Sequence, residues 1–395
     1  MTARRCAVKF ADRLATVGPY LFFDLDQKAA AARARGVDVI NLGIGDPDLP
    51  TPGAIVDAMV EGARDPATHR YPDYQGALRF REAVAHFYQR RFGVALDPRQ
   101  EVLGLIGSKE GISHLTWAAA GPGDVVLVPE PSYPVYAVQA RLAGATVFSL
   151  PLTAGQGFLP DLAAVPDPVW RRAKLLWINY PNNPTGAVAD RAFLADAVDR
   201  CRAHDVLLAS DQAYSEIGYD GYRAPSVLEV PGAKEVAVEF FSLSKPYRMT
   251  GWRLGAAVGR ADAIHALSLV KTNTDSGQFT AIQLAGVRAL EPDQDQAIQE
   301  AVGVYQRRRD LAVSALRAAG FDAAAPRATF YLWVPTPPGL SARDTAALVL
   351  DRTGVVLTPG SAYGESGEGY VRLSLTAPDD RIQEACGRIA AMRLV

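Results

Sequence analysis

Residues 236–246 read VAVEFFSLSKP, a run of mostly apolar residues that leads through two serines to Lys245. A short apolar run of this kind is typical of a parallel strand that is buried on both faces of a sheet. A lysine fixed at a strand end and partly removed from water has a lowered pKa, so its neutral amine becomes available for chemistry. On this motif alone, the competing interpretation is an ordinary, solvated loop lysine.

Four similar apolar runs precede this one, at residues 102–106, 125–128, 175–179 and 206–210. Each is soon followed by glycine, proline, serine or aspartate. Because such runs alternate with helical patterns, the sequence predicts an α/β fold whose central sheet is mostly parallel and flanked by helices. In open α/β sheets the ligand lies beyond the carboxyl ends of the strands, so we expect the chemistry in the residues that follow these runs.

The first ninety residues are mainly helical in pattern. Residues 24–36 predict a helix, and residues 37–42 predict a short extended segment that ends in a glycine-rich and proline-rich turn. Helical spacing then continues over residues 51–91, but the aromatic and turn-forming stretch at 70–76 interrupts it. We therefore expect a loop at 70–76 between two helices.

The domain organisation follows from a change of pattern late in the chain. Mixed strand and helix patterns, including runs at 331–334 and 370–375, replace the long helical periodicity. We expect a large domain over residues 51–284 and a smaller α/β domain over 285–395, to which the segment 1–50 contributes.

Composition and charge exclude several classes of function. A formal net charge of −2 offers no basic excess for a nucleic-acid backbone. The three cysteines are widely spaced, unlike the ligands of a zinc site or a disulfide framework, and we expect no metal ion. Neither a signal-peptide core nor an apolar run of membrane-spanning length is found in the sequence. We expect a cytoplasmic enzyme that binds neither membranes nor nucleic acid.

The first supporting motif is SDQAY at residues 210–214, which follows one of the apolar runs. A carboxylate at a strand end, such as that of Asp211, can pair with a protonated pyridine nitrogen and keep the ring an electron sink. Tyr214, three residues later, can reach the same ring. The alternative is a helix-capping aspartate and a core tyrosine.

Three further motifs lie near strand ends or close to Lys245. Residues 179–186, NYPNNPTG, form a rigid turn whose asparagines can donate to a phenolate oxygen. Residues 107–111, GSKEG, open a helix and expose backbone N–H groups suited to a phosphate. Arg253 comes eight residues after Lys245 and can add a cationic contact to that phosphate, although a plain surface arginine is the alternative.

Together and in this order, these elements resemble the aspartate-aminotransferase-like group of fold-type I pyridoxal-phosphate enzymes, from about residue 21 to the C-terminus. The resemblance implies that pyridoxal 5′-phosphate is carried as a Schiff base on Lys245, which also shuttles protons. It implies that Asp211 pairs with the pyridinium, and that Tyr214 and Asn183 hold the phenolic oxygen.

The resemblance also assigns the cofactor's phosphate and ring face. Ser108, Lys109, Ser242 and Arg253 correspond to the phosphate-binding residues, with Lys109 acting through its backbone. Tyr133, in PSYP at residues 131–134, matches the aromatic residue that stacks on the ring.

Three more positions concern the substrate and the assembly. Arg372 matches the arginine that binds the substrate's α-carboxylate in a bidentate pair, with Gly45 and Asn183 near the same group. Tyr71 matches a residue that reaches the phosphate of the neighbouring subunit. The resemblance therefore implies a homodimer with composite active sites, acting on an amino acid and a 2-oxo acid.

Residues 43–50, 69–72 and 180–188 most resemble those of bacterial LL-diaminopimelate aminotransferases, which implies transfer between LL-2,6-diaminopimelate and 2-oxoglutarate in lysine biosynthesis. Pro246 and Arg248 depart from the Thr and Asn expected in that subgroup. Aminotransferases for N-succinyldiaminopimelate, aspartate, alanine or aromatic amino acids share the cofactor motifs and remain alternatives.

The far end of a diaminopimelate molecule carries an ammonium and a carboxylate, which need partners when buried. Glu110 and Asp46 are the candidates, although both can equally be solvated loop acids. Two functions of other classes also remain open: a pyridoxal-phosphate-dependent β-lyase, and a non-catalytic regulator that senses the cofactor. For the regulator, the segment before residue 24 is too short for a winged-helix module.

Overall fold

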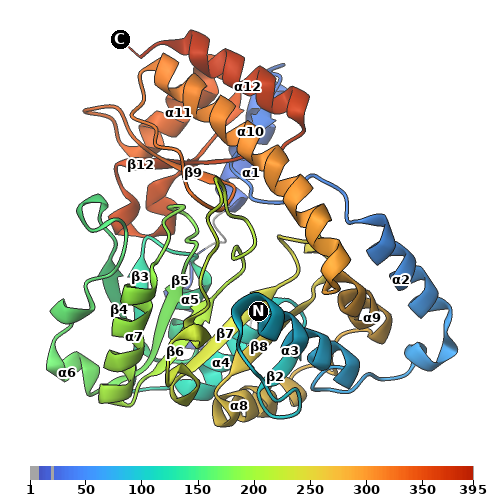
Figure 1. Ribbon diagram of the computed structural model, residues 1–395. Helices are drawn as coiled ribbons and strands as arrows, with labels where there is room; N and C mark the ends of the chain where they lie inside the picture. Colours follow the sequence, from blue (N-terminus) through green and yellow to red (C-terminus); the bar gives the residue numbers. More distant parts are fainter. Residues whose placement is uncertain (1–8, 19–21, 395) are drawn as a thin grey trace, which may run out of the picture.

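A computed structural model describes residues 9–18 and 22–394 of the chain. A seven-stranded sheet lies at its centre, with helices against both faces (Figure 1). The strand order is β2-β8-β7-β6-β5-β3-β4, and all the pairings are parallel except those of β8 with β2 and β7. The strands are β2 (Val102–Leu105), β3 (Val125–Glu130), β4 (Thr146–Pro151), β5 (Ala173–Asn179), β6 (Leu207–Asp211), β7 (Ala237–Ser242) and β8 (Gly255–Gly259).

The central strands read as continuous apolar runs because both faces of the sheet are buried. Along β5, Leu175 and Trp177 belong to one hydrophobic cluster, whereas Leu176 and Ile178 belong to the cluster on the opposite face. This alternation places apolar side chains on both faces of the sheet from Leu175 to Ile178.

The helices that accompany this sheet lie between its strands in the sequence or flank them. Long apolar faces hold them against the sheet or against one another, as α2 lies along α9. They are α2 (Gly53–Arg64), α3 (Leu78–Phe92), α4 (Ser108–Ala119), α5 (Val135–Leu142), α6 (Asp167–Trp170), α7 (Arg191–His204), α8 (Ala261–Thr272) and α9 (Thr280–Ala289).

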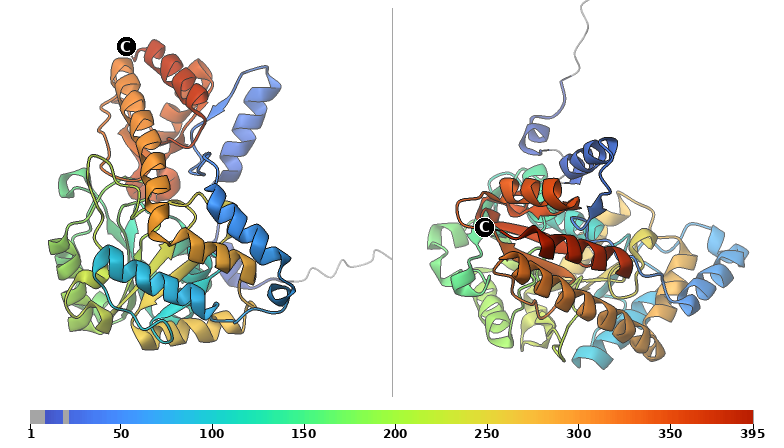
Figure 2. Two further views of the ribbon diagram at one scale, coloured as in Figure 1. Left: turned by 45° about the vertical axis from the view of Figure 1, so that its right-hand side comes forward. Right: turned by 90° about the horizontal axis from the view of Figure 1, so that it is seen from above.

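A second, smaller group of elements combines helix α1 and strand β1 with the C-terminal segments. The antiparallel sheet β11-β12-β9 packs beneath α11 and α12, and the long helix α10 runs from the region of α9 up to them (Figure 1). Helix α1 lies beside these C-terminal helices (Figure 2), with Ala29 and Ala32 packed near Val356. The elements are α1 (Phe22–Ala34), β1 (Ile40–Asn41), α10 (Asp295–Ala319), β9 (Tyr331–Pro335), α11 (Ala342–Thr353), β10 (Val355–Val356), β11 (Thr358–Pro359), β12 (Tyr370–Ser374) and α12 (Asp379–Met392).

The N-terminal segment is tied to the C-terminal part by strand pairing. Ile40 in β1 pairs in parallel with Val355 in β10, and Asn41 pairs with Val356. The glycine-rich turn that follows β1 is thereby carried to the carboxyl edge of the central sheet, where Gly45 lines a cavity.

The α/β class and the five strands expected from the apolar runs are confirmed, as is the loop at residues 70–76. Two strands of the central sheet were not expected. β8 consists of glycine, alanine and valine only, and β4 at the sheet edge has a single buried residue, so neither shows a strong apolar pattern. Within the described residues, none of the helices has both the length and the apolar character needed to cross a membrane.

Candidate active site

A cavity of about 200 Å³ opens at the carboxyl ends of β5, β6 and β7, beside the N-terminus of α4. Its position agrees with the rule that open α/β sheets bind ligands at this edge. Eleven of the twelve residues expected at the site line it: Gly45, Ser108, Lys109, Tyr133, Asn183, Asp211, Tyr214, Ser242, Lys245, Arg253 and Arg372.

Lys245 extends into the cavity just beyond β7, and its Nζ donates to the carbonyl oxygen of Gly45 at 2.9 Å. Burial lowers the pKa of the Lys245 ammonium to about 8, against the opposing attraction of the Asp46 and Asp211 carboxylates. The cations Arg253 and Arg372 lower this pKa further. A substantial fraction of the amine is therefore neutral near physiological pH, as a nucleophile or proton acceptor requires.

Asp211 ends β6 and is fully surrounded by protein. The Tyr136 hydroxyl donates to its Oδ2 at 2.7 Å, the Ala213 N–H donates to Oδ1 at 3.1 Å, and Asn179 Nδ2 donates to the Asp211 carbonyl at 2.8 Å. Burial raises the pKa of the Asp211 carboxyl to about 6, although the donors from Tyr136 and Ala213 and the charge of Lys245 lower it. Asp211 is thus held as a rigid anion facing the cavity, ready to pair with a cationic group.

Arg372 lies on β12 with only 1% of its surface exposed. Its Nη1 donates to Asn183 Oδ1 at 2.8 Å and its Nη2 donates to the Gly43 carbonyl at 2.6 Å. The guanidinium also stacks on Tyr331, whose ring centre lies 4.0 Å from Cζ. Its buried Nε has no hydrogen-bond partner within the described residues, which is unusual for a charged donor and points to a ligand anion.

Tyr214 and Tyr331 face each other across the cavity wall, with their hydroxyl oxygens 3.1 Å apart. Tyr331 also explains a glycine, because a Cβ at Gly45 would collide with its hydroxyl. The absence of a side chain at Gly45 lets the backbone turn approach both Lys245 and Tyr331.

The far end of the cavity has the features of an anion site. Helix α4 begins at Ser108, and the preceding Gly107 has no side chain with which to cap its N–H groups. Arg253 approaches so closely that a Cβ at Gly107 would collide with its guanidinium. Ser242 and Thr250 line the same region, so hydroxyl, N–H and guanidinium donors converge there.

Tyr71 is the exception among the expected residues. It lies in the loop between α2 and α3, outside the cavity, and its side chain is 82% exposed. A large aromatic side chain that projects into solvent is suited to contact another surface.

Comparison with known proteins relates this geometry to a family. Residues 37–389 match the model of aminotransferase class I and II. The chain belongs to this family.

Relatives of this aminotransferase are similar over nearly their whole length. The LL-diaminopimelate aminotransferase of Moorella thermoacetica is 54% identical, over 96% of this chain and 97% of that protein. A solved structure described as a probable N-succinyldiaminopimelate aminotransferase from Thermus thermophilus is 41% identical with a TM-score of 0.88, over 94% and 100% of the chains. A mutant aspartate aminotransferase of the same organism is 30% identical with a TM-score of 0.90, over 98% and 100%.

As a member of this family the chain is an enzyme that uses pyridoxal 5′-phosphate. The cavity fits that cofactor on its own evidence: an uncapped helix N-terminus with an arginine for a phosphate, a buried carboxylate for a ring nitrogen, and a buried lysine of lowered pKa for the aldehyde.

Several residues that shape the cavity were not predicted from the sequence. Tyr136 lies three residues after Tyr133, a closeness in sequence that could have revealed it. Asn179 ends a predicted strand and could have been found for that reason. Tyr331 and the Gly43 carbonyl carry no local signal, because only the pairing of distant segments brings them to the site.

The two acids considered for the far end of the substrate do not line the cavity. Glu110 lies on α4 and points away from the cavity. Its carboxylate accepts the Ile106 N–H at 2.9 Å and pairs with His114 and Lys271. Its place in the first turn of a helix directs it toward the helix's own N-terminus instead. Asp46 is exposed and acts on Lys245 only through its charge.

Proposed function

We propose that this aminotransferase transfers an amino group from LL-2,6-diaminopimelate to 2-oxoglutarate, a reaction of lysine biosynthesis. The observation that carries the proposal is the 54% identity, over almost the full length of both chains, with an LL-diaminopimelate aminotransferase. The Thermus relative described as a probable N-succinyldiaminopimelate aminotransferase supplies the strongest alternative, since it is 41% identical.

In this proposal each lining residue has a role toward the cofactor. Lys245 carries it covalently, and Asp211 pairs with its ring nitrogen. Tyr214 and Asn183 hold its phenolic oxygen, and Tyr133 stacks on its ring. Its phosphate is held by the set Ser108, Lys109, Ser242 and Arg253. The donors that converge at the start of α4 support this last assignment.

Bound pyridoxal phosphate supplies a carbonyl that condenses with amines and a ring that withdraws electrons from the substrate's α-carbon. The chain supplies the rest. With its amine free, Nζ of Lys245 would accept the proton from the substrate's α-carbon, and its pKa of about 8 suits it to give that proton back later. Asp211 remains an anion, so that it stabilises positive charge on the group it faces.

Arg372 binds the α-carboxylate that the amino donor and 2-oxoglutarate have in common. Three features of Arg372 support this role: its buried Nε has no hydrogen-bond partner within the described residues, its guanidinium stacks on Tyr331, and Asn183 fixes its orientation. A guanidinium held in one orientation loses little further entropy when a carboxylate binds. Gly45 lines the same cavity, and its lack of a side chain lets Tyr331 lie beside it.

Three broader features belong to the same proposal. The enzyme acts as a homodimer in which exposed Tyr71 reaches the phosphate region of the neighbouring subunit. Residues 51–284 form a large cofactor-binding domain, and residues 285–395 form a small domain together with the segment 1–50. The protein works in the cytoplasm.

The test is a donor screen with the purified, cofactor-loaded enzyme and 2-oxoglutarate, measuring glutamate formed. LL-diaminopimelate is compared with N-succinyl-LL-diaminopimelate, aspartate, alanine and phenylalanine at equal concentration. We expect kcat/KM to be highest for LL-diaminopimelate. A preference for the succinylated compound or for another donor would refute the proposed substrate and leave the aminotransferase assignment intact.

The same screen separates the remaining classes. A β-lyase acting on a donor with a leaving group on its β-carbon would release an oxo acid and ammonia without forming glutamate. A regulator without catalytic activity would bind the cofactor and give no product with any donor. Stoichiometric glutamate formation contradicts both.

A further inference from the structure

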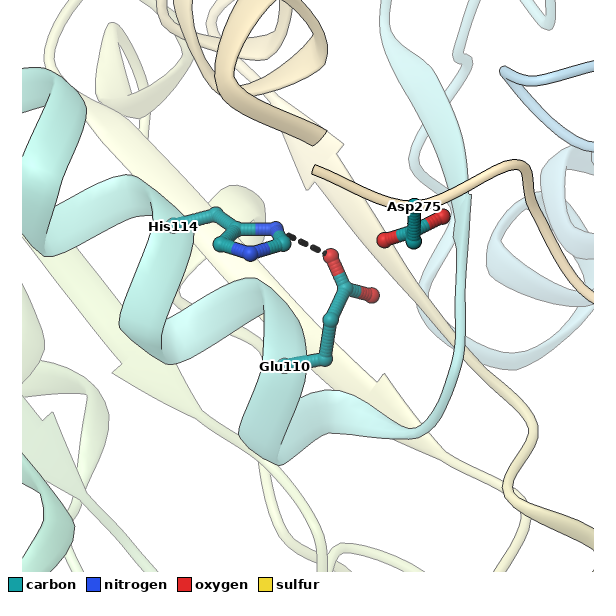
Figure 3. Close-up of side chains that lie close together, drawn as sticks. All are labelled: Glu110, His114 and Asp275. Carbon is teal, nitrogen blue, oxygen red and sulfur yellow. Dashed lines mark ion pairs between the residues drawn. The ribbon is translucent and has the colours of Figure 1, made fainter. Parts of the chain in front are cut away.

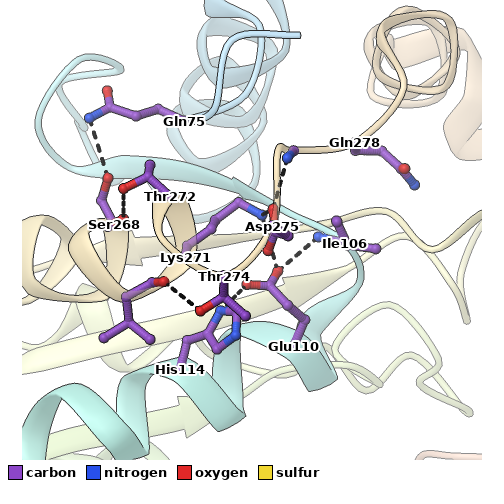
Figure 4. A network of polar contacts seen from close by, with 12 residues as sticks. Gln75, Ile106, Glu110, His114, Ser268, Lys271, Thr272, Thr274, Asp275 and Gln278 are labelled. Atoms are coloured by element: carbon purple, nitrogen blue, oxygen red, sulfur yellow. Dashed lines mark hydrogen bonds and ion pairs between the residues drawn. The ribbon is translucent and has the colours of Figure 1, made fainter. Parts of the chain in front are cut away.

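A largely buried network of polar and charged side chains lies behind the start of α4, outside the cavity. Glu110 and His114 come from α4, and Asp275 faces them from the loop after α8 (Figure 3). The Glu110 carboxylate meets His114 Nδ1 at 2.5 Å and Lys271 Nζ at 3.4 Å (Figure 4). Lys271 Nζ also donates to Asp275 Oδ1 at 2.9 Å.

Lys271 is the centre of this network. Only 1% of its side chain is exposed, so its ammonium depends on the two carboxylates for compensation. Glu110, His114 and Asp275 offer atoms within 4.8 Å of one another, as the ligands of a metal ion would. However, the Lys271 ammonium already contacts both carboxylates, so the chain itself supplies the cation.

One side of the network fixes the beginning of α4. Glu110 stands in the first turn of that helix, and its Oε2 accepts the backbone N–H of Ile106, which precedes the helix. The N–H groups at Ser108 and Lys109 therefore keep a set direction relative to Lys271. Both of these residues line the cavity.

The other side of the network fixes Arg253. Asp275 accepts the Gly277 N–H at 2.8 Å, which shapes the loop. The next residue, Gln278, donates from Nε2 to the carbonyls of Trp252 and Arg253, both at 2.6 Å. We call residues 271–278 the strap, because they connect the start of α4 with the backbone of Arg253 from behind the cavity.

The N-terminus of α4 and Arg253, which the strap connects, lie close together. The Arg253 guanidinium approaches Gly107 without room for a Cβ, and Arg253 has a left-handed backbone with φ of 57°. A non-glycine residue in this conformation needs its surroundings to hold it in place. A small displacement of either end would separate the guanidinium from the helix N-terminus.

We propose that Lys271 and Gln278 are positioning residues that hold the N-terminus of α4 and Arg253 at the spacing that a phosphate monoester requires. The proposal rests on the assignment of these groups to the cofactor's phosphate. Neither residue lines the cavity, so both act through the groups they hold. Their loss should weaken binding of the phosphate and spare the rest of the cofactor.

The experiment compares pyridoxal phosphate with pyridoxal, which lacks the phosphate, in titrations of the cofactor-free protein. The variants are Lys271→Met, Lys271→Arg and Gln278→Ala, with Lys174→Met as a control at an exposed lysine on β5. We expect Lys271→Met and Gln278→Ala each to raise the Kd of pyridoxal phosphate about 10- to 100-fold, the equivalent of one impaired charge-assisted hydrogen bond. The Kd of pyridoxal should change less than about threefold, and Lys271→Arg should recover most of the loss.

Equally weakened binding of pyridoxal phosphate and pyridoxal would mean general damage to the site and would overturn the proposal. Unchanged binding of pyridoxal phosphate would overturn it too. If Lys271→Met does not fold, Gln278→Ala alone decides, because it removes no buried charge. A wild-type Kd that changes on adding EDTA or Mg²⁺ would assign the network to a metal ion instead. Since no amino donor is present, the outcome is independent of which amino acid the enzyme uses.

Discussion

Replacing Tyr136 by phenylalanine removes a hydroxyl that donates to Asp211 at 2.7 Å and leaves the ring in place. The ring is buried and stacks on Trp177 with centroids 5.0 Å apart, so the packing should survive. Burial raises the pKa of the Tyr136 phenol well above its usual value, so it stays protonated and donates throughout the working pH range. Without this donor the pKa of Asp211 must rise above about 6.

The size of the effect follows from the strength of the lost bond. A hydrogen bond to a charged group contributes about 1.5–3 kcal/mol, which moves the pKa of Asp211 to roughly 7–8. At pH 7 the ionised fraction then falls from about nine tenths to between about a half and a tenth. Cofactor binding that needs the ionised carboxylate should weaken about two- to tenfold at pH 7 and hardly at all at pH 9.

The assay measures the Kd of pyridoxal phosphate for the cofactor-free wild type and variant between pH 6.5 and 9. Lys245 is present in both proteins, so the ratio of the two constants reports the effect of the lost hydroxyl. Tyr219→Phe is the control, because that buried hydroxyl has no hydrogen-bond partner within the described residues. A ratio that stays constant with pH, or a ratio of one throughout, would refute the reasoning.

Three further predictions concern single residues. Lys245→Ala should lower kcat for glutamate formation by about 10²- to 10⁴-fold or more, because the proton-transferring amine is lost; a normal rate would contradict the assignment. Arg372→Lys should raise KM about tenfold for the amino donor and for 2-oxoglutarate alike, since both carry the α-carboxylate, and an effect on only one would exclude the shared role. Glu239→Gln tests a buried carboxyl on β7 whose pKa burial raises to about 7. Because of this raised pKa, the unfolding free energy of the wild type falls by up to about 1.4 kcal/mol per pH unit as the pH rises from 4.5 to 7. The denaturation midpoint of the variant should therefore depend less on pH in that window.

The sequence predicts that Asp211 and Lys245 meet at one site because both residues lie at strand ends. Asp211 and Lys245 come at or just after the ends of apolar runs, and a parallel sheet brings such ends to one edge. Local patterns therefore suffice to gather these residues. β8 escapes prediction because glycine and alanine have little strand preference; its strand position is set by the neighbours β2 and β7.

The side of the cavity around Arg372 depends on contacts that no local pattern records. Arg372 binds the Gly43 carbonyl from 329 residues away, and Tyr331 meets Tyr214 from 117 residues away. A backbone carbonyl looks the same at every position of a sequence, so its use can be found only from the fold. The same limit applies to Glu110, whose carboxylate turns toward Lys271 across 161 residues.

The pairing of β1 with β10 also bears on how the protein is made. The glycine-rich turn lies within the first fifty residues and is synthesised early. The strand that pairs with β1 begins only at Val355, and the Thr358 hydroxyl that donates to the Gly43 carbonyl is 315 residues distant. During synthesis the turn therefore lacks its pairing partner while the central sheet forms, since domains fold as units from the N-terminus onward. The nascent chain thus acquires the groups proposed to bind the cofactor before Arg372 and the paired turn can complete the cavity. Chains truncated before β10 should therefore bind pyridoxal phosphate without becoming competent enzymes.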